Sequence, residues 1–140
     1  MRFSTSRKLP VTWVNRGGPA ILHLPGQLAV YPIVPLEARG WSVGEYLARL
    51  AAGLQAGLEE QAVRTEIHHR HGGLWARSGQ LAALGVAVKN WTTYHGAYVN
   101  VTPDLRGFGF VNSDSRLNKP MSSLAADRRQ RVLMTKVREA

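Results

Sequence analysis

Residues 16–33 read RGGPAILHLPGQLAVYPI, which places a glycine pair, a histidine and a proline–glycine turn before an apolar run. Gly17 and Gly18 lack a Cβ, so the backbone can take a positive φ and a ligand can lie directly against it. Arg16 offers a planar fork of donors that suits a carboxylate, a phosphate or a buried carbonyl. His23 is the only group in the stretch that titrates near neutral pH. The pattern indicates either a ligand-binding loop or a glycine turn with a core histidine, and spacing alone favours the turn.

Residues 42–45 match a capping box, in which Ser42 caps a helix and Glu45 bonds back to the cap. From Val43 to about Ala62, apolar residues recur every three or four positions, as on one face of an amphipathic helix. We expect this helix to pack on a sheet and to have a structural role.

Apolar and β-branched runs predict five strands, at residues 11–14, 27–33, 74–77, 80–89 and 92–101. Glycine at position 79 suits a tight turn between the third and fourth strands, and residues 90–91 make the next turn. With the helix between the second and third strands, this order predicts an α+β fold with a mixed or antiparallel sheet and packed helices. A weak apolar face over residues 125–140 predicts a last helix.

Three histidines, His68, His69 and His71, lie within four positions, as metal ligands sometimes do. No cysteine and no second cluster completes a ligand set. We therefore expect a solvated loop over residues 66–73 and no metal site.

The chain has 140 residues, enough for one domain with a buried core. It has no cysteine, which excludes disulfides and thiol chemistry, and no run of about 18 apolar residues that would span a membrane. The N-terminus lacks the apolar segment of a secretory signal. These features predict a cytoplasmic protein.

The formal net charge is +9 at pH 7, and such a surface attracts nucleic acid, anionic membranes or acidic proteins. The sequence has no basic strand with interleaved aromatic residues of the kind that stacks bases. Nucleic acid is therefore not the expected partner, although a basic RNA-binding domain stays open as an alternative.

Three separated stretches carry a family pattern. Residues 16–33 follow RGG-x-x-T-Y-H-G-P-G-Q-L-x-x-Y-P-I, with Leu22 at an aromatic position and Leu24 at a glycine position. Residues 79–85 are similar to G-x-K-[IL]-A-[AS]-[IL]-G, and residues 93–108 to [ST]-x-H-G-x-A-L-N-V-x-x-D-L-x-x-F. Together they resemble the lipoyl(octanoyl) transferase family, over roughly residues 11–111.

The resemblance implies a single domain over residues 1–140 with the biotin/lipoyl protein ligase fold, which is class II synthetase-like. The family carries a further N-terminal portion, including strands of its sheet, that is missing here. The implied reaction uses no cofactor and moves octanoyl from acyl carrier protein through an enzyme cysteine to a lysine. That lysine belongs to the lipoyl domains of 2-oxo acid dehydrogenases or to the glycine cleavage H protein.

The two reactive groups of the family are replaced in this chain. Asp114 stands at the position of the cysteine, and Gln80 at the position of the lysine that would lower the thiol pKa. Three alternatives follow: an oxyester on Ser113 or Ser115, direct attack of the amine on the bound thioester, or binding of acyl groups or carriers without turnover. Direct attack would be helped by His23 or His95, and binding without turnover is the favoured alternative.

The resemblance also implies which residues bind the substrate. We expect three segments to wall one pocket, with His23 and His95 facing it, while Trp91, Tyr94 and Phe108 lie in the core or at the rim. The segments are Arg16, Gly17, Gly18, Pro19, Ala20, Ile21, Leu22 and His23; Ala83, Leu84 and Gly85; and His95, Gly96, Ala97 and Tyr98.

Overall fold

A five-stranded sheet with the order β1-β5-β4-β3-β2 forms the centre of the computed structural model, which describes residues 9–68, 72–110 and 120–140. Each neighbouring pair of strands runs antiparallel. The strands are β1 Gln27–Val30, β2 Glu66–His68, β3 Gly73–Ala76, β4 Gly79–Lys89 and β5 Thr92–Asn100. The predicted α+β class with an antiparallel sheet is therefore confirmed.

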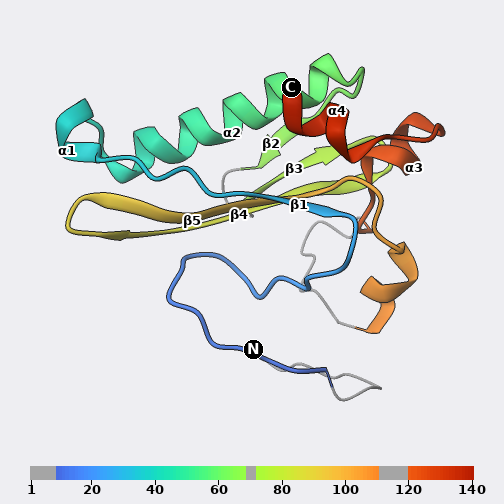
Figure 1. The fold of residues 1–140 in the computed structure, drawn as a ribbon, viewed down its shortest axis with the longest axis horizontal. Helices are drawn as coiled ribbons and strands as arrows, with labels where there is room; N and C mark the ends of the chain where they lie inside the picture. Colours follow the sequence, from blue (N-terminus) through green and yellow to red (C-terminus); the bar gives the residue numbers. More distant parts are fainter. Residues whose placement is uncertain (1–8, 69–71, 111–119) are drawn as a thin grey trace.

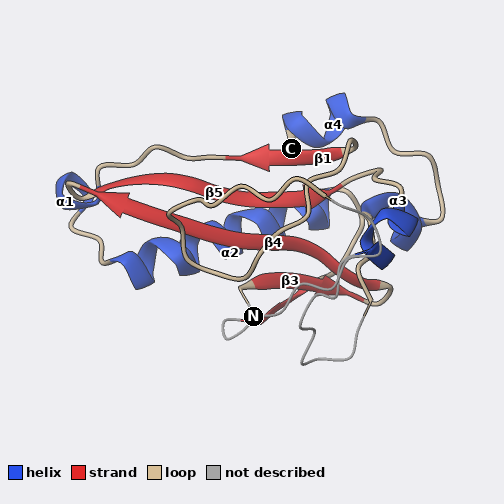
Figure 2. Ribbon diagram, turned by 90° about the horizontal axis from the view of Figure 1, so that it is seen from below, coloured by secondary structure: helices blue, strands red, loops and turns tan. Residues whose placement is uncertain are grey.

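The helices α2, α3 and α4 cover one side of this sheet, and the chain that leads into β1 crosses the other side (Figure 1). Seen from that other side, the leading segment runs in front of β4 and β5 (Figure 2). The helical segments are α1 Leu36–Arg39, α2 Val43–Glu60, the 3₁₀ helix η2 Leu105–Phe110, α3 Leu124–Arg128 and α4 Met134–Glu139. The sheet thus has a helix side and a loop side.

Helix α2 begins at the predicted capping box. The Ser42 hydroxyl accepts a hydrogen bond from the Glu45 backbone N–H at 3.2 Å, and the Glu45 carboxylate accepts one from the Ser42 N–H at 2.7 Å. Tyr46, Ala51 and Leu58 are its buried residues. The helix predicted from residue 43 to about 62 is confirmed.

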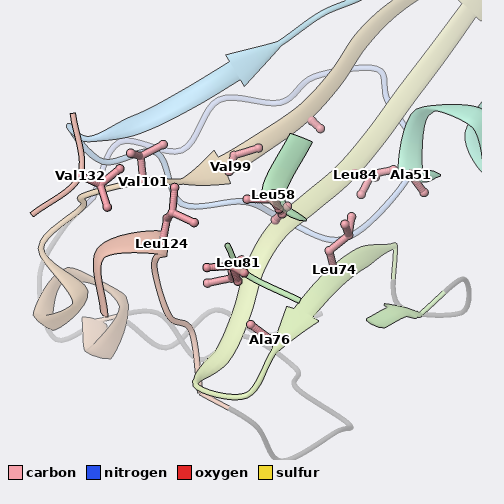
Figure 3. Packing of buried hydrophobic residues seen from close by; sticks show 13 residues of the cluster. Ala51, Leu58, Leu74, Ala76, Leu81, Leu84, Val99, Val101, Leu124 and Val132 are labelled. Atoms are coloured by element: carbon pink, nitrogen blue, oxygen red, sulfur yellow. The ribbon is translucent and has the colours of Figure 1, made fainter. Parts of the chain in front are cut away.

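The main core lies between α2, α3 and the helix side of the sheet, where Leu58, Leu81 and Leu124 meet (Figure 3). A register shift between β3 and β4 leaves Leu81 as an extra residue, because Leu74 pairs with Ala82 while Trp75 pairs with Gln80. This bulge lets Leu81 enter the core and leaves Gln80 on the loop side with Trp75.

Several local predictions were wrong. Residues 11–14 form no strand, and Val11 and Trp13 are 80% and 92% exposed, since no neighbouring strand pairs with them. Residues 66–68 form strand β2 instead of a solvated loop, because they pair with β3. The helix predicted over residues 125–140 is divided into α3 and α4 by Arg129, whose φ is +53°.

Other features were not predicted or cannot be described. The short helices α1 and η2 were not predicted. His69 and His71 lie outside the described residues, and among the residues that the structure does describe no group of three His, Asp or Glu side chains could hold a metal ion. No helix in the described part of the chain is long and apolar enough to cross a bilayer.

Candidate functional site

The glycine loop that precedes β1 binds directly to β4 on the loop side of the sheet. The Gly17 N–H donates a hydrogen bond of 2.8 Å to the Val86 carbonyl oxygen. The Arg16 guanidinium, through Nη1, donates bonds of 3.0 Å to the carbonyl oxygens of Gly17 and Pro19, which fold the loop around it. The motif of residues 16–33 therefore packs on strand β4, which carries the motif of residues 79–85.

Gly85 makes this approach possible. A Cβ at position 85 would lie 2.5 Å from both the Arg16 Nη1 and the Gly17 carbonyl oxygen, closer than real Cβ contacts. Gly18 adopts a φ of +91°, which a residue with a side chain rarely takes, beside the Leu84 carbonyl oxygen. The glycines of the two motifs thus serve to bring the loop against the strand.

The Gln27 side chain anchors the backbone on both sides of His23. Its Oε1 accepts a hydrogen bond of 2.9 Å from the Leu24 N–H, and its Nε2 donates one of 3.1 Å to the Leu22 carbonyl oxygen. The same Nε2 donates a bond of 2.9 Å to Oδ1 of Asn100, which is only 2% exposed. His23 lies between the two anchored residues, so its place over the third motif is fixed by this amide.

The Tyr98 ring joins the loop that carries His23 to strand β5, which carries His95. The His23 ring lies over the Tyr98 ring with centroids 4.0 Å apart and planes inclined at 47°. Tyr31 contacts both Tyr98, at 5.6 Å, and His95, at 5.8 Å, in edge-on geometry. His23 and His95 therefore belong to one ring cluster that Tyr31 and Tyr98 bridge.

The electrostatics of the cluster favour an uncharged histidine. Burial, and secondarily the nearby charge of Arg16, lower the pKa of His23, while its hydrogen bond with Gln27 acts in the opposite direction. Burial also lowers the pKa of Arg16, although Tyr98 partly offsets this. A neutral imidazole beside a guanidinium can accept a proton from an attacking amine.

Gln80, at the position where the family pattern has lysine, lies on the same side of the sheet. Its Nε2 donates a hydrogen bond of 3.2 Å to the Ala82 carbonyl oxygen and would lie 2.7 Å from a Cβ added at Gly73. Its backbone exchanges hydrogen bonds of 2.9 Å with the Pro120 carbonyl and the Ser122 N–H. Residues 113–115, which include Asp114 and the two candidate serines, lie outside the described residues.

The remaining predicted substrate-binding residues divide between the two sides. Leu84 and Ala97 pack in the core on the helix side, where Figure 3 shows Leu84 near Ala51 of α2. Their side chains therefore do not line the loop side, in contrast to the prediction. Ile21 and Leu22 are half-buried in the loop, and Pro19 and Ala20 are exposed.

Sequence reasoning did not assign Gln27, Tyr31 or Asn100 to the site. All three fall inside the matched motifs, so the motif boundaries could have included them. An apolar cavity of about 360 Å³ lies on the opposite side, lined by residues of α2, β1 and α4 such as Leu54, Leu28 and Val137. It contains none of the predicted site residues.

The whole chain, residues 1–140, matches the family model described as the lipoyl protein ligase A/B catalytic domain. The chain belongs to this family. It is 35% identical to an octanoyltransferase of Geotalea uraniireducens over 130 residues, which are 93% of this chain and 61% of the relative. It is 37% identical to an octanoyltransferase of Geobacter metallireducens over 116 residues, 83% of this chain and 54% of the relative. The predicted resemblance is confirmed.

Solved structures of lipoate protein ligases share the fold. A putative lipoate protein ligase from Thermoplasma acidophilum with bound lipoic acid superposes with a TM-score of 0.65 at 15% identity, over 88% of this chain and 52% of that one. A bi-partite lipoate protein ligase from the same organism gives 0.65 at 13% identity, over 89% and 52%. The predicted ligase-type fold is therefore confirmed, and the chain spans about half to three-fifths of the length of these relatives.

Proposed function

We propose that this chain carries the acyl-binding site of an octanoyltransferase-type protein of lipoate biosynthesis. The observation that carries the proposal is the packing of the Arg16–His23 loop on Gly85 and Tyr98, which brings all three motifs to one side of the sheet. Relatives at 35% and 37% identity carry the name octanoyltransferase. The octanoyl chain would lie on this side of the sheet.

The proposed donor is octanoyl acyl carrier protein, and the proposed acceptor is the lysine of a lipoyl domain. Lipoyl domains of 2-oxo acid dehydrogenases and the glycine cleavage H protein fit this role, and one structural neighbour was solved in a study of a ligase and its E2 lipoyl domain. The net charge of +9 would favour acidic carrier proteins. A cytoplasmic location and a single domain over residues 1–140 are part of the same proposal.

In this proposal the amine attacks the bound thioester directly, without an acyl-enzyme, since Asp114 stands where the family pattern has its cysteine. The lysine nitrogen attacks the thioester carbonyl, an N–C bond forms and the C–S bond breaks. Neutral His23 accepts the amine proton and passes it to the departing thiolate. Arg16, on the same loop, adds positive charge near the developing oxyanion. Turnover is expected to be slow, since neither a nucleophile nor a lysine at position 80 assists it.

The test incubates the chain with octanoyl carrier protein and apo lipoyl domain, and weighs all three proteins by mass spectrometry. We expect octanoyl to appear on the lipoyl domain and not on the chain. The Gln80→Lys/Asp114→Cys variant should transfer roughly a hundred- to ten-thousand-fold faster. The Gln130→Lys/Glu60→Cys variant is a matched control, because both positions are exposed and lie outside the three motifs. Binding of the carrier without any transfer would support the non-catalytic alternative and contradict the proposed chemistry.

A further inference from the structure

The apolar cavity of about 360 Å³ on the helix side lies between α2, α4 and the edge strand β1, which Figure 1 shows side by side. Aliphatic side chains from each of these elements form its walls, such as Leu28 and Val30 of β1, Leu54 of α2 and Val137 of α4. Small-molecule sites in proteins typically measure about 300–1,000 Å³ and are mostly apolar with a few polar groups. The cavity therefore has the size and the walls of a site for one small ligand with a hydrocarbon body.

Two glycines of α2 leave the cavity open on the side of this helix. Gly53 and Gly57 lie four positions apart, on one face of the helix, and both line the cavity. A Cβ at Gly53 would meet no described heavy atom within 4 Å, and a Cβ at Gly57 would meet Ala140 at 3.9 Å, an ordinary contact. Glycine weakens a helix interior, and the packing does not require it at either position. Its structural effect here is the free volume beside α2.

Two arginines bring positive charge to this apolar lining. Arg49 of α2 and Arg138 of α4 both line the cavity, and no acidic side chain of the described residues does so. The Arg49 guanidinium carbon lies 4.5 Å from the centroid of the Trp41 ring, a cation–π contact that orders the side chain without neutralising its charge. The ion pairs formed within the described part of the chain include neither arginine and not the Ala140 carboxylate. Both guanidinium groups therefore stay available to an anion.

We propose that this cavity binds an aliphatic monocarboxylate, with its hydrocarbon chain between β1 and α2 and its carboxylate toward Arg49 and Arg138. The apolar walls would remove the chain from water, and the planar guanidinium fork matches the geometry of a carboxylate. A carrier-bound acyl group is a thioester without a carboxylate, so it lacks the head group that this site would recognise. The inference does not rest on the proposed function, because the cavity contains none of the residues predicted to bind the acyl carrier substrate.

The experiment titrates the full chain with sodium octanoate at pH 7 and low salt, by isothermal titration calorimetry. We expect one saturable site in the wild-type chain, and roughly tenfold weaker binding in Arg49→Gln/Arg138→Gln, because each exposed charge interaction contributes up to about fivefold. Arg39→Gln/Arg64→Gln removes two exposed arginines outside the cavity and should bind octanoate as wild type does. Octylamine has the same chain with a positive head group and should bind wild type at least tenfold more weakly than octanoate.

Gly53→Leu fills the cavity from α2 and so tests where octanoate binds. Leucine favours a helix more than glycine does and finds open space at this position, so the variant should melt no lower than wild type. Its affinity for octanoate should nevertheless fall at least tenfold, whereas Ala52→Leu, which adds bulk at an exposed position outside the cavity, should bind as wild type does.

Three results would overturn the inference. They are the absence of saturable octanoate binding by wild type, unchanged binding by Gly53→Leu, and equal affinities of wild type for octanoate and octylamine. Each of these results would leave the proposed function standing, since that function is tested by acyl transfer from the carrier protein.

Discussion

The side-chain amide of Gln27 donates a hydrogen bond of 2.9 Å to Oδ1 of Asn100, and so ties the histidine loop to the end of β5. Both residues belong to motifs that are separated by about 70 positions in the sequence. The same amide anchors the backbone on either side of His23. The Gln27 side chain therefore determines how the motif of residues 16–33 lies over the motif of residues 93–108.

Replacing Gln27 with alanine should destabilise the chain and loosen the loop. The buried Asn100 carbonyl and two backbone groups would lose their partner, and an unsatisfied buried group costs about 1–3 kcal/mol. Urea unfolding at neutral pH measures the loss. Gln130→Ala, at an exposed position, should change the free energy of unfolding by less than about 0.5 kcal/mol. Equal effects of the two substitutions would show that the Gln27 bonds do not matter.

Gly85→Ala should separate the glycine loop from β4. The added Cβ would lie 2.5 Å from Arg16 and Gly17, and relief of such overpacking costs about 1–3 kcal/mol. We expect lower stability in urea and weaker binding of octanoyl carrier protein. Gly53→Ala is an opposite control, because Gly53 lies inside α2 with open space around it. It should raise stability by roughly 0.5–1 kcal/mol, as alanine does inside a helix.

The stability of the chain should depend on pH through His23. Its pKa is lowered in the folded chain, so the folded state binds fewer protons than the unfolded state below about pH 6.5. The stability that neutral His23 contributes is present above that pH and is lost as the pH falls through the folded pKa. We expect the free energy of unfolding to decline less steeply from pH 7 to 5 in His23→Gln than in wild type. Parallel declines would contradict the prediction.

The capping box of α2 offers a test of stability that is independent of the site. Ser42→Ala removes the hydroxyl that caps the helix, which costs about 1 kcal/mol. Thermal melting should register this loss, whereas the affinity for octanoyl carrier protein should stay within twofold of wild type. A large loss of binding would mean that the helix side and the loop side are more strongly coupled than the packing suggests.

Helices, strands and turns were predictable from the sequence where neighbouring residues alone determine them. The capping box fixed the start of α2, and glycine at position 79 marked the β3–β4 turn. The strand predicted over residues 11–14 failed because its β-rich composition has no neighbouring strand to pair with. Conversely, β2 forms in a polar, histidine-rich segment because β3 offers it a partner. Pairing partners lie far along the chain and leave no local signal.

The site was predictable as a set of motifs but not as a set of side chains. Leu84 and Ala97 lie in matched motifs, yet strand alternation turns them into the core. The bulge at Leu81 reverses the alternation, which is why Gln80 shares a side with Ala83. A bulge depends on the register between strands, and spacing within one motif cannot reveal it.

The central claim is that acyl chains bind on the loop side, where the three motifs converge. The most direct test is photo-cross-linking with carrier protein that bears a diazirine-labelled acyl chain, followed by peptide mapping. We predict label in residues 16–23, 83–85 or 96–98, and its loss when unlabelled octanoyl carrier protein competes. Competed label confined to the cavity on the helix side, in residues 50–58 or 137–140, would contradict the account.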